Sequence, residues 1–169
     1  AAGGGLQLQL TNDIVVTNPL RLGSSGFAED GILKNVSGNN TVTDFGLSGL
    51  GGTRIHVVGG SILNLPNAFA VGPGSGAQNF RVIGSGTVFL GGDNSAVLQP
   101  ANIFLLGLGS GAGPTVKVGH EMAFGLGSIS FQPQSASTIQ SSDVVSPTLA
   151  NELIFASTPF NQVTFGSAV

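Results

Sequence analysis

Short runs of apolar residues recur along almost the whole chain, separated by glycine or small polar residues. Several runs alternate apolar and polar side chains, as in residues 6–10 (LQLQL) and 116–118 (VKV). This alternation is typical of a β-strand with one buried face. We therefore expect strands at residues 6–10, 13–16, 20–22, 32–36, 41–47, 54–58, 61–65, 80–83, 87–90, 103–106, 115–118, 129–131, 153–155 and 162–165.

Glycines stand between these runs, where the chain has to turn. Because glycine adopts positive φ angles without steric cost, glycine-rich pairs and triplets mark tight turns. The expected turn glycines are Gly59, Gly60, Gly84, Gly86, Gly91 and Gly92. Short strands with glycine corners fit a sandwich, a barrel or a solenoid, so their spacing alone does not choose among these folds.

Two features favour the solenoid. One plan, an apolar pair, glycine, a small polar residue and a second apolar pair, returns at residues 57–63, 82–88 and 124–130. Degenerate repetition of this kind is typical of the sequences of proteins built from stacked coils. The chain also has 11 Phe but no Trp or Tyr, whereas an immunoglobulin-type sandwich usually has a buried Trp and a corner Tyr. We expect an all-β parallel β-solenoid in which phenyl rings stack along an elongated core.

Residues 31–41 (GILKNVSGNNT) resemble a phrase of the autotransporter-associated β-strand repeats. Residues 59–65 (GGSILNL) and 84–94 (GSGTVFLGGDN) are similar to further elements of these repeats. The resemblance is good over residues 6–94 and weaker over 95–132. It implies a right-handed parallel β-helix that is exported to the bacterial cell surface or medium.

The resemblance ends before residues 133–160, which contain Pro133, Pro147 and Pro159 with many Ser and Thr. Proline and small polar residues break the strand rhythm, so we expect a loop excursion or a non-repetitive capping segment there. The whole chain, 1–169, is interpreted as one solenoid domain or a fragment of a longer one.

The composition supports a folded strand protein with few charges. Hydrophobic residues make up 41%, charged residues 8%, and the formal net charge is −3. This argues against disorder, and it leaves little material for the polar faces of helices. The five cations are scattered at Arg21, Lys34, Arg54, Arg81 and Lys117, so nucleic-acid binding is disfavoured. No apolar run reaches the length of about 20 residues that a membrane helix needs, and we expect no membrane insertion by this segment.

The sequence shows no clear constellation for catalysis, a cofactor or a metal. There is no cysteine, and the acids are dispersed at Asp13, Glu29, Asp30, Asp44, Asp93, Glu121, Asp143 and Glu152. Coiling could still bring two acids together for glycosidase chemistry, but turn residues are the simpler interpretation. His120 and Glu121 could join a metal site completed by distant residues, although exposed turn residues are again favoured. We predict no enzymatic activity, no cofactor and no metal.

Asn35, Asn39 and Asn40 surround Gly38 in the most specific motif of the chain. Their amides suit an asparagine ladder at a turn, in which side chains of successive coils bond to one another and to backbone groups. We favour this structural role over ligand binding.

The leading functional hypothesis is an extracellular structural rod for display, adhesion or self-assembly. Leu6, Leu8 and Leu10 near one end and Val163 and Phe165 near the other lie in runs without charge. Uncovered edge strands pair with other chains, so these residues predict head-to-tail self-association, with other surface proteins as the alternative partners. A carbohydrate-binding or carbohydrate-cleaving β-helix is the alternative, although the lack of Trp and Tyr disfavours a sugar platform. A third alternative places the activity in sequence beyond these residues.

Overall fold

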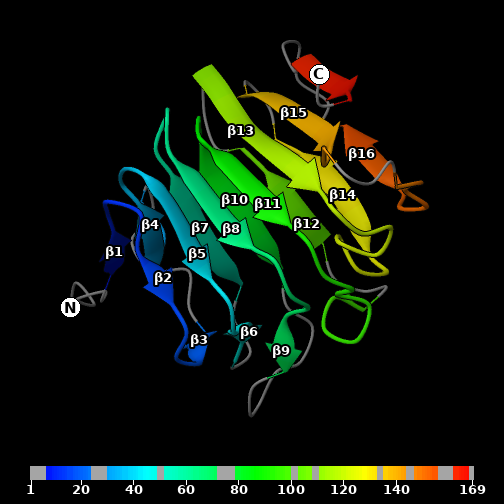
Figure 1. Ribbon diagram of the computed structural model, residues 1–169. Helices are drawn as coiled ribbons and strands as arrows, with labels where there is room; N and C mark the ends of the chain where they lie inside the picture. Colours follow the sequence, from blue (N-terminus) through cyan, green and yellow to red (C-terminus); the bar gives the residue numbers. More distant parts are fainter. Residues whose placement is uncertain are drawn as a thin grey trace, which may run out of the picture.

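The computed structural model describes residues 7–23, 30–48, 52–71, 79–99, 103–107, 111–132, 135–143, 147–155 and 162–167. These residues form strands and turns and contain no helix (Figure 1). The strands in chain order are β1 (Leu8–Leu10), β2 (Val15–Val16), β3 (Leu20–Leu22), β4 (Leu33–Asn35), β5 (Asn39–Val42), β6 (Phe45–Leu47), β7 (Thr53–Val57), β8 (Ile62–Leu65), β9 (Ala70–Val71), β10 (Phe80–Gly84), β11 (Thr87–Leu90), β12 (Ile103–Leu106), β13 (Gly111–Val118), β14 (Ser128–Phe131), β15 (Ser135–Ser141), β16 (Leu153–Phe155) and β17 (Gln162–Gly166).

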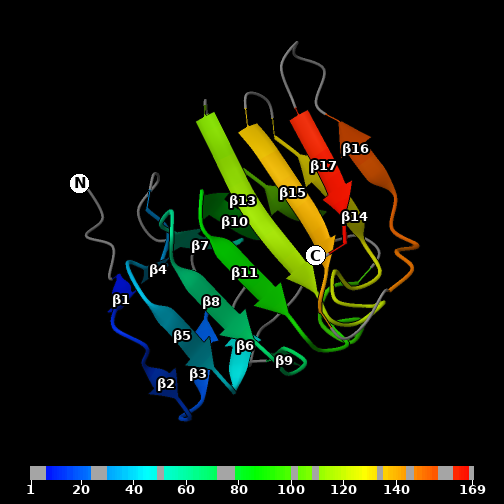
Figure 2. The same ribbon diagram turned by 45° about the horizontal axis from the view of Figure 1, so that its top comes forward.

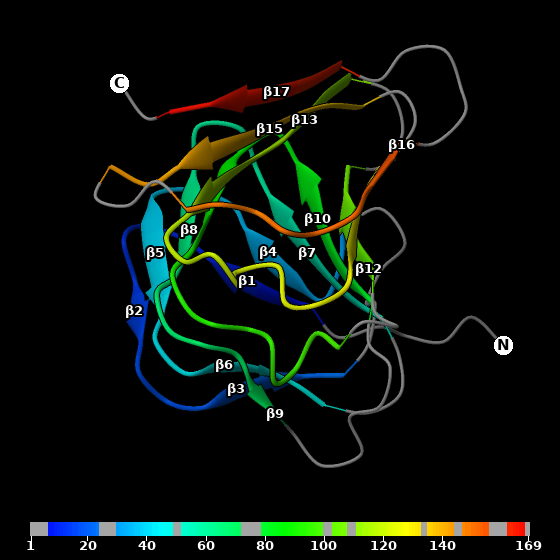
Figure 3. The same cartoon turned by 90° about the vertical axis from the view of Figure 1, so that its right-hand side faces the viewer.

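The strands belong to three parallel sheets, which we call A, B and C. In the described part of the chain, sheet A has the order β1-β4-β7-β10-β12-β14-β16 and sheet B the order β2-β5-β8-β11-β13-β15-β17. Sheet C is shorter, with β3-β6-β9. Seen along the axis, the chain passes from sheet A to sheet B and returns to sheet A one layer nearer the viewer, winding as a right-handed coil (Figure 3). The predicted parallel β-solenoid is therefore confirmed.

Strand register places each coil on equivalent positions of the coil before it. In sheet A, Leu33 pairs with Leu8 and Ile55 pairs with Leu33, spacings of 25 and 22 residues. In sheet B, Leu63 pairs with Val88, which in turn pairs with Val116. Because side chains alternate across a strand, in-register stacking sends the same set of apolar residues inward in every coil.

A column of phenyl rings runs through the core, as the phenylalanine-rich composition predicted. The rings of Phe45, Phe69, Phe80, Phe104 and Phe124 follow one another with centroid separations of 4.9, 5.2, 5.1 and 4.7 Å. These distances lie in the range where aromatic pairs attract one another beyond the burial of area. All five rings are buried among the aliphatic side chains of the same core cluster.

The turn glycines serve two different purposes. Gly38, Gly60 and Gly84 have φ angles of 78°, 80° and 91°, a region that residues with a Cβ rarely adopt. Gly92 instead permits close approach, since a Cβ there would collide with the backbone of Asn67 and Ala68 in the preceding coil. An added Cβ would likewise collide with a neighbouring coil at three further glycines. The neighbour is Ser85 for Gly59, Val57 for Gly86 and Pro66 for Gly91.

The strand rhythm continues through residues 135–141, contrary to the expected interruption at 133–160. β15 lies in sheet B between β13 and β17, and Ile139 pairs with Val116 and Phe165. The sequence concealed this strand because its inward positions include Ser137, a buried serine in place of an apolar residue. The irregular stretch is confined to 142–143 and 147–152 among the described residues of that segment.

The third side of the solenoid changes character along the axis. Strands β3, β6 and β9 of sheet C form this side in the first coils. In later coils, turns at residues 95–98 and 121–126 take their place (Figures 1 and 2). These turns still fill the core, because Leu98 and Phe124 are fully buried. The structure also differs from expectation elsewhere: the run 41–47 splits into β5 and β6, β13 begins at Gly111 rather than at residue 115, and β9 was not predicted.

Replacing Phe104 with alanine tests the phenyl column. Phe104 lies between Phe80 and Phe124, so the truncation leaves a cavity with rings on both sides. We expect the free energy of unfolding to fall by about 3–5 kcal/mol. Urea denaturation followed by circular dichroism measures it. The control, Val71→Ala, removes a side chain that is 58% exposed and should change stability by less than about 0.5 kcal/mol.

Candidate functional site

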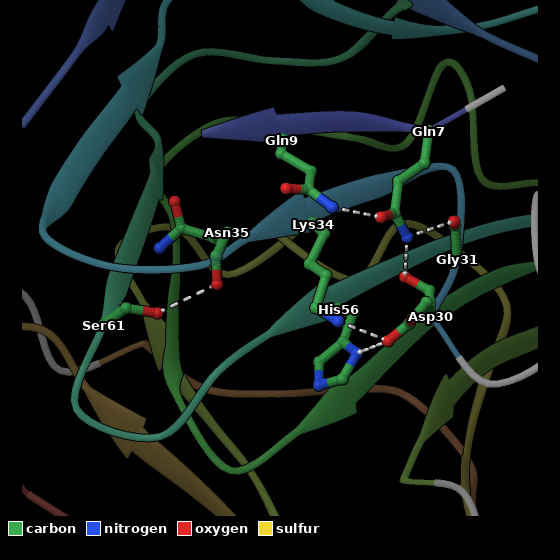
Figure 4. Close-up of polar contacts among 8 residues, drawn as sticks. All are labelled: Gln7, Gln9, Asp30, Gly31, Lys34, Asn35, His56 and Ser61. Carbon is green, nitrogen blue, oxygen red and sulfur yellow. Dashed lines mark hydrogen bonds and ion pairs between the residues drawn. The ribbon is translucent and has the colours of Figure 1, made fainter. Parts of the chain in front are cut away.

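The outer face of sheet A carries a connected group of polar and charged side chains. Gln9 on β1, Lys34 on β4 and His56 on β7 occupy one in-register row across three coils. Gln7 and Asp30 lie beside this row (Figure 4). We call Gln7, Gln9, Asp30, Lys34 and His56 the sheet A polar cluster.

The carboxylate of Asp30 is the centre of the polar cluster. Its Oδ1 accepts a hydrogen bond from Lys34 Nζ at 2.6 Å and lies 3.1 Å from His56 Nδ1 (Figure 4). The amide of Gln7 donates to the carbonyl oxygens of Asp30 and Gly31, at 3.2 Å each, and Gln9 Nε2 donates to Gln7 Oε1 at 2.8 Å. The cluster thus connects three consecutive coils through side chains as well as through the backbone ladder.

Asp30 and His56 both have altered proton affinities. The hydrogen bond from Lys34 is the main cause that lowers the pKa of Asp30, and His56 contributes in the same direction. Burial lowers the pKa of His56 and outweighs the hydrogen bond to Asp30, which raises it. A hydrolytic triad contains an imidazole that is oriented by a carboxylate, so Asp30 and His56 provide two of its three groups. The groups that contact one another in this cluster are amides, a carboxylate, an ammonium group, the imidazole and backbone carbonyls, so the arrangement offers ion pairing and proton binding.

Arg54 and Arg81 form a second group on the same face. They occupy directly opposite positions on the neighbouring strands β7 and β10. A small cleft of about 170 Å³ lies here, lined by Gly52, Thr53, Arg54, Asn79, Arg81 and Leu105. Burial, and then the positive charge of Arg54, lowers the pKa of Arg81. This pairing of like charges was not singled out in the sequence, because register is needed to bring the two arginines together.

The predicted turn asparagines divide between the inside and the outside of the corner. Asn35 and Asn40 are buried, and Asn40 Nδ2 donates to Asn35 Oδ1 at 2.6 Å and to the Ser37 carbonyl at 2.7 Å. Asn40 Oδ1 accepts from the Ile14 N–H at 2.7 Å, and Asn35 Nδ2 donates to the Ile62 carbonyl at 2.9 Å. The pair lies within one coil and contacts the coils before and after it.

Asn39 lies outside this buried pair, on the exposed surface, where its Oδ1 accepts a hydrogen bond from Asn64 Nδ2. Ser61 completes the inner corner, since its hydroxyl donates to the Asn35 and Val58 carbonyls at 3.2 and 2.7 Å (Figure 4). The amide contacts therefore combine one exposed contact between coils with one buried pair inside a coil.

Asn94 is a second buried corner amide, which the sequence analysis did not single out. Its Oδ1 accepts from the Phe69 N–H at 2.7 Å and its Nδ2 donates to the Ala123 carbonyl at 2.7 Å. Asn151 makes a related contact by donating to the carbonyls of Gly125 and Gly127. The usable signal was an asparagine shortly after a Gly-Gly pair, at Gly91 and Gly92.

A groove of about 480 Å³ lies on the outer face of sheet B. It is lined by Asn39, Ile62, Asn64, Thr87, Phe89, Lys117, Gly119, Ser142 and Asp143. The ring of Phe89 lies across Gly91 and Gly119, where an added Cβ would approach ring carbons within 2.9 Å. Lys117 and Asp143 form an ion pair of 3.6 Å at the groove. The groove thus offers one ring, amides, hydroxyls and one charge pair.

Four of the residues predicted to mediate self-association, Leu8, Leu10, Val163 and Phe165, lie on the outermost strands of the two large sheets. β1 is one edge of sheet A, and β17 is one edge of sheet B. Leu8 and Phe165 are exposed, at 39% and 52%, whereas Leu10 is buried in the core and Val163 is partly buried. The side chain of Leu10 therefore does not contribute to an exposed edge, and Leu6 lies outside the described residues.

An apolar hollow of about 520 Å³ opens at the end of the solenoid that carries β16 and β17. Its apolar lining includes Val118, Ile139, Pro147, Leu149, Leu153 and Phe165, and Gln140, Ser141, Asn151, Gly166 and Ser167 complete it. Leu153, Ile154 and Phe155 on β16 are exposed beside it. An exposed apolar hollow at the end of the solenoid is a candidate interaction site.

The remaining candidate residues stay apart in the described part of the chain. No group of three or more His, Asp or Glu there is arranged to hold a metal. His120 Nδ1 accepts the N–H of Met122 at 3.0 Å, and Glu121 is exposed in the same turn. Among the same residues, no helix has the length and apolar character to cross a membrane.

Searches with this chain find no matching family model, no matching curated protein and no matching solved structure. The description of its candidate sites therefore rests on the chain's own residues.

Titration of His56 tests the electrostatics of the sheet A polar cluster. Burial lowers its pKa in the folded protein, so the midpoint of the His56 imidazole signals in NMR should lie below the ordinary value of about 6.5. The unfolded chain then binds the proton more tightly, and the free energy of unfolding should fall as the pH drops through about 6.5.

The variant Asp30→Asn should lower the His56 midpoint further, because the carboxylate favours the protonated imidazole. Asp44→Asn is the control, since Asp44 pairs with Arg21 on sheet C at 2.7 Å. A midpoint above about 6.5 in the unmodified protein would contradict the assigned environment of His56.

Substituting Asn40 tests the buried corner amides. Asn40→Ala removes the hydrogen-bond acceptor of the Ile14 N–H and the donor to Asn35 Oδ1, and the free energy of unfolding should fall by about 1–3 kcal/mol. Asn39→Ala removes an exposed amide of the same corner and should cost less. Equal urea midpoints for the two variants would show that the buried pair does not hold the coils together.

Proposed function

We propose that this chain is a structural solenoid of an extracellular or cell-surface scaffold, with the rod itself as the working part. Seven-stranded sheets, a continuous aromatic core and corner amides that connect successive coils support a mechanical role. The sequence resemblance to autotransporter-associated β-strand repeats supports export from a bacterial cell. The single observation that carries the proposal is the in-register stacking of coils along one axis.

The rod extends by stacking a further β-coil onto the end that carries β16 and β17. β16 and β17 are the outermost strands of sheets A and B there, so their outer backbone groups face away from the sheets. The apolar hollow beside them would receive apolar side chains of that added coil. A second copy of the chain, joined through β1 and β2, is the simplest source of such a coil.

Carbohydrate binding is the second candidate function, and the groove on sheet B is the feature that favours it. Phe89 provides a ring face, while Asn64 and Thr87 provide hydrogen-bonding groups beside it. Its lining residues include one carboxylate, Asp143, whereas hydrolysis with paired carboxylates needs two. The groove therefore suits binding of a neutral sugar better than cleavage. A polysaccharide panel measured by affinity electrophoresis, with and without Phe89→Ala, tests this alternative.

Sedimentation at increasing protein concentration tests the proposed end-to-end stacking. We expect a growing fraction of dimers and longer assemblies. Phe165→Lys should weaken the association at least about tenfold, since a charge placed in the apolar hollow opposes burial by more than about 1.4 kcal/mol. The matched control is Ile62→Lys, which adds the same charge at an exposed apolar position on the outer face of sheet B. A monomer at every concentration would overturn this mode of extension.

A further inference from the structure

Arg54 and Arg81 bring two like charges together without a visible counter-charge. They are directly opposite each other on β7 and β10, strands that lie about 4.8 Å apart in a sheet. Like charges in this position repel each other and destabilise the pairing. The other cations, Arg21, Lys34 and Lys117, each have an acidic partner. Neither Arg54 nor Arg81 has an ion pair with an acid in the described part of the chain.

One hydrogen-bond donor of this pair is also without a partner. Arg54 Nε is buried and has no hydrogen-bond partner in the structure. A buried N–H without a partner is costly, and such groups are uncommon in folded proteins. Asp30 lies on the same face, but its carboxylate is engaged by Lys34 and His56. Both the charge and the donors of the pair therefore favour an external acceptor.

The cleft at the two arginines limits the size of that acceptor. Its volume of about 170 Å³ is below the range of about 300–1,000 Å³ that is usual for sites holding drug-sized ligands. Arginine presents a planar fork of N–H donors that matches carboxylate and other oxyanions in two-point contacts. A single oxyanion group fits both the size and the donor set, while nucleic acid needs a longer basic surface than two arginines provide.

We propose that Arg54 and Arg81 bind one oxyanion group, sulfate or carboxylate, of an acidic polysaccharide. The group lies in the cleft and accepts hydrogen bonds from both guanidinium groups. It neutralises the two opposed charges. The site is on the side of the rod, on the outer face of sheet A, so it stays accessible whether or not the coils stack end to end.

Inorganic sulfate is the first probe, and the Nε–H signals of the arginines in ¹⁵N NMR are the readout at constant ionic strength. We expect saturable shifts for Arg54 and Arg81. The variants Arg54→Gln and Arg81→Gln should each weaken binding at least tenfold. Arg54→Lys and Arg81→Lys keep the charge but lose the planar fork of donors. Their affinity for sulfate should therefore lie between that of the unmodified protein and that of the glutamine variants. Arg21→Gln is the control, because Arg21 already pairs with Asp44.

Dextran sulfate and uncharged dextran are the second pair of probes, measured by calorimetry. Dextran sulfate should bind in a manner that depends on both arginines, and uncharged dextran should not bind there. A sulfate response that is equal in every variant would overturn the site. Binding of inorganic sulfate without binding of dextran sulfate would overturn the polysaccharide as ligand. Circular dichroism of each variant establishes that it is folded, and neither readout depends on self-association.

Discussion

The parallel backbone ladder between successive coils is the constraint on which the rest of this structure depends. Once Leu33 pairs with Leu8, and Ile55 with Leu33, every inward position lies over an inward position of the neighbouring coil. A shift of one residue would turn the whole set of side chains to the opposite face. The phenyl column from Phe45 to Phe124 follows from this register, because rings in adjacent coils have to meet.

Because successive coils stack at the spacing of neighbouring β-strands, the corners have to pair their backbone groups and allow the coils to approach closely. Backbone groups at the turns lose their ladder partners, and buried amides replace them, as Asn40 does for Ile14 and Asn94 for Phe69. Close approach of coils excludes a Cβ at positions such as Gly92. The high glycine content and the corner asparagines are thus both consequences of the close stacking of coils, and both can be recognised in the sequence.

Period-two alternation and glycine corners are local signals and predicted the strands, while degenerate repetition and the phenylalanine-rich composition then favoured the solenoid. The sequence located strands 20–22, 87–90, 103–106 and 153–155 as they occur. It missed β15, where Ser137 takes an inward position, and it could not pair Arg54 with Arg81. These residues are 27 positions apart, and the length of each coil, which sets their register, depends on turns of varying size. The candidate site therefore emerged only from the structure.

In the described part of the chain, sheet C does not continue beyond β9, so the solenoid has unequal sides. Two walls are continuous hydrogen-bonded sheets, while turns close the third wall in later coils. A lateral load on such a body meets stiff resistance along the two sheets and yields first on the turn side. Bending is therefore anisotropic, because individual hydrogen bonds, such as that from the Leu126 N–H to the Leu98 carbonyl, connect the coils on the turn side in place of a strand ladder.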